Sequence, residues 1–197
     1  MFKNTPRQAV AELNILEKTC AKLNYILNDT KKQPKILICD NETCDFFSVL
    51  ITRTELYKKE ILLIDNISSL TARGKSPEDE IFYCVFVLRP TKDNIDLLQL
   101  ELSNPHYEYY DIFFTNAINE EQIREIAMRD TSGRIQELKE IFIDFSALGA
   151  QLFSLNIPNI SGLRINPSAS LSDRIASSLF SAICSLNLKP IIRYENN

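Results

Sequence analysis

Short apolar runs alternate with helix-forming segments along this chain, and the alternation limits the folds open to it. The runs cover residues 35–40 (KILICD), 60–65, 81–90 and 109–115, with further strand-like residues over 141–157. Runs of this kind, without polar alternation, are typical of parallel strands buried on both faces. The sequence therefore predicts an α/β fold, with a mainly parallel sheet flanked by helices in a Rossmann-like layer.

Helical segments lie between the predicted strands. We expect helices over residues 7–27, within 42–59, over 92–103, from Asn119 to about 140 with a break at 132–133, and over 171–187. Thr91 and Asn119 are the expected N-caps, and Gln122 completes a capping box with Asn119. Residues 68–80 and 158–169 have the composition of loops, and residues 189–194 that of a last strand.

The predicted strands are unevenly distributed along the chain. Those near residues 36, 61, 83, 111 and 142 are enough for one three-layer domain. The residues after about 145 offer only two or three strands and one long helix. We interpret them as the beginning of an incomplete second α/β unit, which leaves sheet edges and apolar faces unpaired.

The composition excludes several classes of protein. Hydrophobic residues make up 45% of the 197 residues, enough for a core, yet no apolar run is long enough to predict a membrane span. A net charge of −4 matches nucleic acid or anionic lipid poorly. The five cysteines lack CxxC spacing, which predicts neither a disulfide framework nor a zinc site, and indicates a reducing, cytosolic location. The N-terminus lacks the apolar core of a signal peptide.

Few residues in the sequence suggest chemistry. Asp40 and Asp65 end predicted parallel strands, where paired carboxylates could hold magnesium or accept a phosphoryl group, although Asp also begins turns. Cys39 and Cys44 could be reactive thiols, but the apolar strand around Cys39 favours inert packing. His106, the single histidine, is expected in a solvated loop. We find no phosphate-binding glycine loop, and interpret the chain as a binding module without catalytic residues, cofactor or metal.

Several stretches, in a fixed order, resemble the amino-terminal part of one known family. They read KILICD, TRTELYKKEILLIDNI, FVLRPTKDNIDLLQLEL, YDIFFTNAINEEQI, AQLFSLNI and KPIIRY. In combination they resemble the Sec/Munc (SM) family, the partners of syntaxin-type SNAREs, and especially its endosomal branch. The resemblance covers roughly residues 30–197.

The family resemblance implies a domain organisation. SM proteins have an α/β first domain, a second α/β domain built from two separated segments, and a helical third domain between those segments. By resemblance, residues 1–142 are domain one and residues 143–197 are only the opening of domain two, with the helical domain absent. The chain would then be a shortened product or one piece of a longer gene.

The resemblance also implies two surfaces for a syntaxin. SM proteins hold the syntaxin N-terminal peptide on the outside of domain one, in an apolar pocket beside an acid. Here the pocket falls on Ile123, Ala127 and Leu138, and the acid on Glu140.

The second implied surface is a cleft between domains one and three that clasps the syntaxin helical bundle. Its domain-one wall falls near Asp40, Cys44 and Asp65. Without domain three, peptide binding is expected to survive, whereas SNARE templating is expected to be lost.

The implied function is a non-enzymatic syntaxin-binding module for vesicle docking and fusion in intracellular protein transport. It would be recruited from the cytoplasm to endosome or trans-Golgi membranes through a SNARE, without inserting into the membrane. Two alternatives stay open: a small α/β enzyme or phospho-receiver domain that uses Asp40 and Asp65, and a degenerate fragment that folds poorly.

Overall fold

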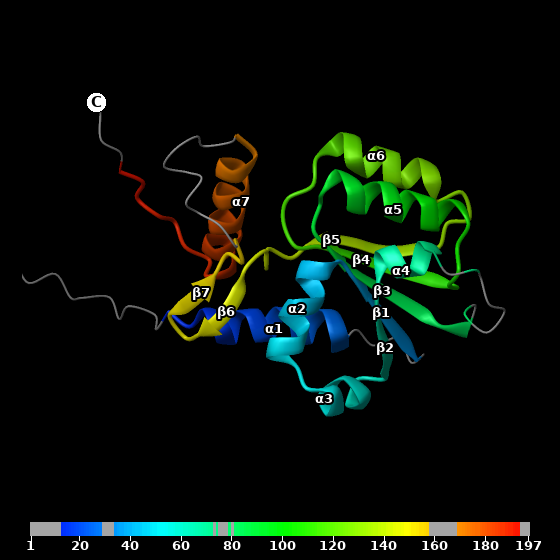
Figure 1. Cartoon of the computed structure of the whole chain (residues 1–197), viewed down its shortest axis with the longest axis horizontal. Coiled ribbons are helices and arrows are strands. Elements are labelled where there is room, and N and C mark those ends of the chain that lie inside the picture. Colours follow the sequence, from blue (N-terminus) through cyan, green and yellow to red (C-terminus); the bar gives the residue numbers. More distant parts are fainter. Residues whose placement is uncertain are drawn as a thin grey trace, which may run out of the picture.

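A five-stranded parallel sheet organises the molecule (Figure 1). Its strands are β1 (Lys35–Cys39), β2 (Ile61–Asn66), β3 (Tyr83–Leu88), β4 (Tyr109–Phe114) and β5 (Ile135–Glu140). They lie in the order β2-β1-β3-β4-β5, and every neighbouring pair is parallel. The predicted α/β class is therefore confirmed, and the chain changes direction across the sheet between β1 and β3.

The computed structural model describes residues 13–28, 34–72, 74, 79, 81–157 and 169–193. Its helices are α1 (Ile15–Asn28), α2 (Asn41–Leu50), α3 (Arg53–Lys58), α4 (Ile67–Ala72), α5 (Lys92–Ser103), α6 (Glu120–Arg129) and α7 (Ala169–Ser185). The predicted first helix is confirmed over its described part, and its predicted residues 7–12 lie outside the described residues. Within that described part, no helix is long and apolar enough to cross a membrane.

The core lies on both faces of the sheet. One apolar cluster joins the sheet to α4, α5 and α6, and a second joins the opposite face to α1, α2 and α3. Figure 1 shows α5 and α6 on one side of the sheet and α1 and α2 on the other. Because β1 and β3 are central, all their side chains are buried, as the apolar runs predicted.

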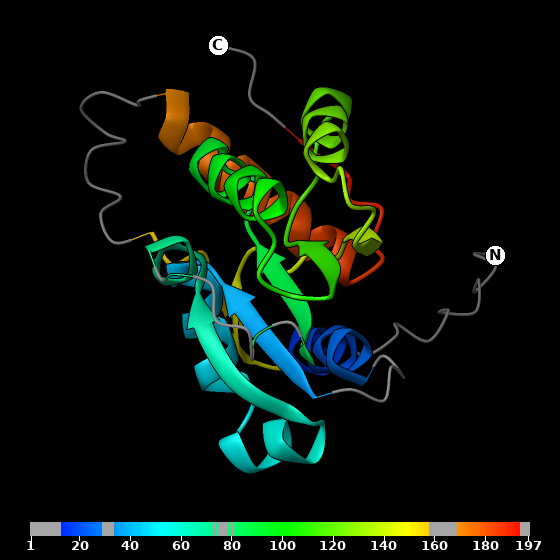
Figure 2. The same cartoon turned by 90° about the vertical axis from the view of Figure 1, so that its right-hand side faces the viewer.

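The predicted burial of β2 is wrong. Leu62 and Leu63 are exposed, because β2 is an edge strand with one neighbour, β1 (Figure 2). The residues after it also differ from the prediction, since the segment expected to be a loop begins with the short helix α4. The ends of a predicted strand can be read from sequence, but its place in the sheet depends on tertiary pairing.

The second half of the helix predicted from Asn119 to 140 is also wrong. The helix α6 ends at Arg129, and after the turn at Gly133 the chain forms β5 instead. The Asn119 cap and its capping box with Gln122 are confirmed, since each side chain accepts a hydrogen bond from the other's backbone N–H. The charged residues of β5 lie on an edge strand, where they discourage pairing with another chain.

His106 is buried rather than solvated, which corrects the prediction. Its Nδ1 lies 2.6 Å from Oε2 of Glu101, and its backbone N–H donates to Oε1 of the same carboxylate at 2.9 Å. The Tyr110 hydroxyl donates to that Oε1 at 2.6 Å. The buried Glu101 therefore joins the end of α5 to the start of β4, and His106 belongs to this structural network.

The C-terminal part begins with a small antiparallel hairpin. Strands β6 (Ser146–Gly149) and β7 (Leu152–Ser154) form it, and α7 follows (Figure 1). Ile141 and Ile143 precede β6 and donate backbone hydrogen bonds to Phe114 and Thr115, so part of the predicted strand at 141–157 extends the sheet edge. Residues 189–193 are not a strand, contrary to prediction, and Tyr194 lies outside the described residues.

Candidate functional site

Two short helices and the edge strand β2 surround a groove on one side of the sheet. The chain turns between α2 and α3 at Thr52, whose hydroxyl accepts a hydrogen bond from the Glu55 N–H while the Glu55 carboxylate accepts one from the Thr52 N–H. This capping box fixes the angle at which α3 begins. Leu56 then packs into the core, which anchors α3 beside β2.

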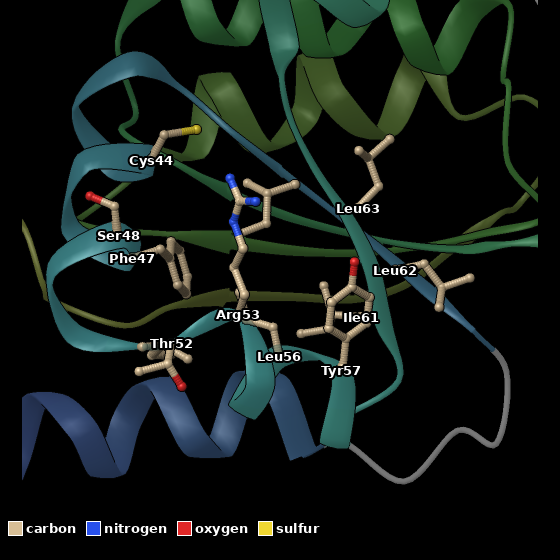
Figure 3. A pocket seen from close by; sticks show the side chains of 12 residues that line it. Cys44, Phe47, Ser48, Thr52, Arg53, Leu56, Tyr57, Ile61, Leu62 and Leu63 are labelled. Atoms are coloured by element: carbon tan, nitrogen blue, oxygen red, sulfur yellow. The ribbon is translucent and has the colours of Figure 1, made fainter.

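The groove has a volume of about 550 Å³ and a mainly apolar lining. Figure 3 shows the Arg53 side chain lying between α2 and β2, with Tyr57 near Ile61. The residues that line the groove are Cys44, Phe47, Ser48, Ile51, Thr52, Arg53, Leu56, Tyr57, Ile61, Leu62, Leu63 and Ile64. Such a surface fits an apolar side chain of a partner and offers one cation at its centre.

Cys44 is the one residue of the predicted cleft wall that lines this groove. A hydrogen bond with Cys39 lowers the pKa of the Cys44 thiol, although partial burial and the nearby Asp40, Asp45 and Asp65 act in the opposite direction. Burial raises the pKa of Cys39 well above its usual value, and this thiol is fully enclosed in the core, as predicted.

Asp40 lies behind the groove rather than on its surface. The carboxylate is buried and accepts four hydrogen bonds, from the Thr43 N–H and hydroxyl, the Arg89 N–H and the Asn94 amide, at 2.7–2.9 Å. It thereby caps α2 and holds the loop after β3. Asp40 thus has a structural role, and its lone pairs are already used by the chain.

Asp65 lies on β2, half-buried, and its carboxylate accepts a hydrogen bond from the next backbone N–H, that of Asn66, at 2.7 Å. The Asp65 carboxylate is close enough to Cys44 to raise the pKa of that thiol, so Asp65 lies near the end of the groove that Cys44 lines. Among the described residues, no group of three or more acidic, histidine or cysteine side chains is placed to hold a metal ion. The Asp40 carboxylate, buried and occupied by four hydrogen bonds, is poorly placed to bind magnesium or accept a phosphoryl group.

The second predicted surface lies on α6 and β5. Ile126 points into the core, whereas Ile123 and Ala127, one turn apart on α6, are exposed. Ile126 thus belongs to the core, while Ile123 and Ala127, the two α6 residues of the predicted pocket, lie on the surface. Because Ile123 and Ala127 are not used by the core, they form an apolar strip that is available to a partner.

Glu140 and Leu138 lie on β5. The Glu140 Oε1 accepts a hydrogen bond from the Ile118 N–H at 2.8 Å, which brings the end of β5 to the residue before the α6 cap. Glu140 is exposed, whereas Leu138 is half-buried and packs against the core cluster under α5 and α6. The structure thus places an exposed acid near the N-terminus of α6, while Leu138 serves mainly as core.

Sequence reasoning missed Arg53 and Tyr57, which line the groove. The pattern Thr52-Arg53-Thr54-Glu55 carried a usable signal, since Ser or Thr followed by Glu three positions later marks a helix start. It would have divided the predicted helical segment 42–59 at the right place.

The comparisons with known proteins agree with this geometry. The model of the Sec1 family matches residues 35–197. The vacuolar protein sorting-associated protein 45 of Dictyostelium discoideum is 30% identical over 186 residues, which cover 94% of this chain and 32% of the relative. Its human counterpart is 31% identical over 183 residues, with 93% and 31% covered. The chain thus spans about a third of the length of these relatives.

A solved structure of the SM protein Vps45 has the same fold. It matches 92% of this chain and 34% of its own, with a TM-score of 0.84 and 28% identity. A structure of Vps45 in complex with the Qa SNARE Tlg2 matches 90% of this chain and 32% of its own, with a TM-score of 0.81 and 26% identity. With most of its length matched by the family model, the chain belongs to the Sec1 family of SM proteins.

Proposed function

We propose that this chain is a SNARE-binding module of an SM protein that acts in vesicle docking and fusion during intracellular protein transport. The observation that carries the proposal is its likeness to Vps45, which has been solved in complex with the Qa SNARE Tlg2. SM family proteins are non-enzymatic regulators of SNAREs, which argues against the enzyme alternative. The family resemblance suggests recruitment from the cytoplasm to endosome or trans-Golgi membranes through the SNARE.

The α6 and β5 surface is our proposed site for the N-terminal peptide of a syntaxin. Ile123 and Ala127 offer exposed apolar surface to an apolar side chain of the peptide, with Leu138 at its base. Glu140 offers a carboxylate to a basic residue, and its bond to the Ile118 N–H holds that carboxylate near α6. A free peptide tail could reach this surface without domain three.

Simple magnitudes say how much of the affinity this site supplies. Burial of one large aliphatic side chain contributes about 1.5–3 kcal/mol. An exposed ion pair adds about 0–1 kcal/mol, whereas a micromolar complex requires about 8 kcal/mol. Backbone contacts and further peptide side chains must therefore provide much of the binding free energy.

The groove between α2, α3 and β2 is our proposed domain-one wall for the folded part of the SNARE. Its apolar lining and the central Arg53 suit a helix that presents apolar side chains and an acid. Cys44 lines this wall, Asp65 lies beside it, and Asp40 supports it from behind. Because domain three would supply the other wall of the cleft, we expect domain one alone to bind the syntaxin helical bundle weakly and not to template SNARE assembly.

Titration of a fluorescently labelled syntaxin N-terminal peptide tests the site. We expect Ile123→Arg to weaken binding by about tenfold or more, because it replaces the apolar contact with a charge. Glu140→Gln keeps an acceptor for the Ile118 N–H and removes only the charge, so we expect a smaller loss, which high salt should abolish.

Met128→Arg is the matched control, since Met128 is also an exposed apolar residue of α6 but lies outside the proposed pocket. Circular dichroism and thermal melting check that each variant is folded. Equal binding by wild type, Ile123→Arg and Glu140→Gln would refute the site. Failure of every chain, wild type included, to bind any syntaxin peptide would refute the proposed function itself.

A further inference from the structure

Four charged side chains form a closed ring at the carboxyl end of the sheet. Arg89, which follows β3, donates from Nη1 to Oε1 of Glu42 at 2.5 Å and from Nε to Oδ1 of Asp144 at 3.1 Å. Arg174, on α7, donates from Nη2 to Oε2 of Glu42 at 2.6 Å and from Nη1 to Oδ2 of Asp144. Each arginine thus bridges both acids, and each acid accepts from both arginines.

The ring is largely shielded from water. The side chains of Arg89, Arg174 and Asp144 are 16%, 15% and 4% exposed, and only Glu42 is more open, at 41%. Its formal charges cancel, so the ring is not an anion site. Charge-assisted hydrogen bonds of this kind are stronger than neutral ones, and removal of one member leaves a partly buried charge unpaired.

The position of the ring in the fold is informative. Glu42 follows β1 and Arg89 follows β3, so both lie at the point where the strand order changes direction. In open α/β sheets this crevice is the usual place for a ligand. Here α7 supplies the arginine that enters it, from a residue 132 positions away from Glu42 in sequence.

Polar contacts also join α7 to the sheet domain elsewhere along the helix, beside the edge-on contact of Phe180 with Phe142 and a small apolar cluster that buries Ala182. The Ser178 hydroxyl donates to the Asp144 carboxylate at 3.2 Å, the Ser181 hydroxyl accepts from the Asp144 N–H at 2.8 Å, and the Ser185 hydroxyl donates to the Phe142 carbonyl. With Arg174, these serines form one stripe along the helix. We call this contact the serine seam. A seam of small hydroxyl groups can separate at a lower cost than an interlocked apolar core.

Through Glu42 the ring is joined to the helix that forms one wall of the groove. Glu42 lies in the first turn of α2, the helix that carries Cys44, Phe47 and Ser48 into the groove lining. The N-cap of the same helix, Asp40, accepts a hydrogen bond from the Arg89 backbone N–H at 2.7 Å. Arg89 therefore contacts the start of α2 through two hydrogen bonds, one from its backbone to Asp40 and one from its side chain to Glu42. Arg174 binds the other carboxylate oxygen of Glu42.

We propose that the ring of Glu42, Arg89, Asp144 and Arg174 couples α7 to α2, so that docking of α7 fixes the wall of the groove. These four side chains are positioning residues for the groove, since none of them lines it. By linkage, a partner that orders α2 also tightens the docking of α7. The functional use of the coupling rests on the proposed function, whereas the coupling itself is tested without any partner.

Native-state hydrogen exchange of the full chain, read by peptide, tests the coupling. Arg174→Gln removes both ion pairs made by α7 and keeps most of the side-chain length. We expect amide exchange to accelerate about tenfold in α2 as well as in α7, the effect of losing a charge-assisted hydrogen bond. Modification of the Cys44 thiol, followed by mass spectrometry, should accelerate in parallel.

Two control variants separate coupling from general loosening. Ser185→Ala weakens the serine seam at the last turn of α7, away from the ring, so we expect faster exchange confined to that turn and unchanged exchange in α2. Arg124→Gln removes an exposed ion pair on α6, with Glu120 at 3.2 Å, and should change neither. If Arg174→Gln does not fold, Glu42→Gln breaks the ring on the α2 side instead, and it should accelerate amide exchange in α7.

Two results would overturn the proposal. In the first, Arg174→Gln, or Glu42→Gln in its place, changes exchange on its own helix alone. In the second, Ser185→Ala accelerates exchange in α2 as much as Arg174→Gln does, so that the ring has no special part. Loss of syntaxin binding with the coupling intact would count against the proposed function only.

Discussion

The sheet domain and the C-terminal part are held together in different ways. The sheet buries large apolar clusters on both faces, with Phe86, Phe113 and Phe114 fully enclosed. The C-terminal part buries a cluster whose buried members are only Ile15, Phe145, Ala147 and Ala182. Extensive hydrophobic burial therefore stabilises the sheet domain, whereas α7 is held on it by a small apolar cluster together with many polar contacts.

The C-terminal part also leaves apolar surface uncovered. Leu148 and Leu152 on the hairpin are exposed, as are Leu179 and Phe180 on α7 and Ile191 and Ile192 after it. Exposed apolar side chains of this size are surface that further structure could cover. The observation is consistent with the prediction that residues 143–197 begin a second α/β unit, and it predicts that the two regions differ in stability.

The largest expected effect is in the sheet. Phe86 lies at the centre of β3, fully buried, with its ring stacked on Tyr110 at a centroid distance of 5.8 Å. We expect Phe86→Ala to lower the free energy of unfolding by about 3–5 kcal/mol, because it leaves a cavity between sheet and helices. Denaturant unfolding followed by circular dichroism measures this loss.

Leu152→Ala is the control for that measurement, because it removes an aliphatic side chain that is 60% exposed on the hairpin. We expect a change within about 0.5 kcal/mol. If the two variants lost similar stability, the contrast between a self-sufficient sheet domain and an incomplete C-terminal part would be wrong.

Removal of α7 should have an intermediate effect. A chain that ends at residue 157 loses Arg174 and the serine seam but none of the clusters on the two faces of the sheet. We expect its unfolding to stay cooperative, with a free energy lower by about 1–3 kcal/mol, the sum of a few net hydrogen bonds. Sedimentation and denaturant unfolding would show whether the shortened chain is a folded monomer. An unfolded or aggregated product would favour the degenerate-fragment alternative.

The sequence predicts the central part of the fold well because burial there is uniform. The runs that form β1, β3 and β4 are apolar except for Lys35 and Asp111, as their place inside the sheet requires. The segment IQELKE, by contrast, has only two apolar residues, Ile135 and Leu138, spaced three apart as on a helix, so the sequence predicts a helix where the structure has β5. An edge strand carries fewer apolar residues, so its signal is weaker.

The candidate site was predictable only where neighbours in sequence define it. The Asn119 cap of α6 is visible from its local pattern, but the local pattern does not show that Ile126 faces the core while Ile123 is exposed. The bond from Arg174 to Asp144 spans 30 residues, and the one to Glu42 spans 132. No periodicity connects residues so far apart, so the ring depends on the tertiary fold alone.

The smallest expected effect concerns Lys22, where α1, the sheet edge and α7 meet. Its Nζ donates to the carbonyls of Ile141 and Phe142 at 2.7 and 3.2 Å and to the Ser185 hydroxyl at 2.9 Å. Burial lowers the pKa of its ammonium from 10.5 to about 8, against the opposing influence of Cys184. Between these two pH values the unfolded chain keeps a proton that the folded chain has lost.

Stability should therefore rise with pH through this window, because the unfolded state binds more protons there. The side chain is only partly buried, so solvent screening should limit the rise to at most about 1 kcal/mol. The measurement is the free energy of unfolding from pH 7 to 10.5 for wild type, Lys22→Met and, as a control, Lys18→Met, which changes an exposed lysine of the same helix. Only Lys22→Met should flatten the profile. An unchanged profile would contradict the prediction, because it would mean that the three oxygen acceptors keep the proton on Lys22 in the folded chain despite its burial.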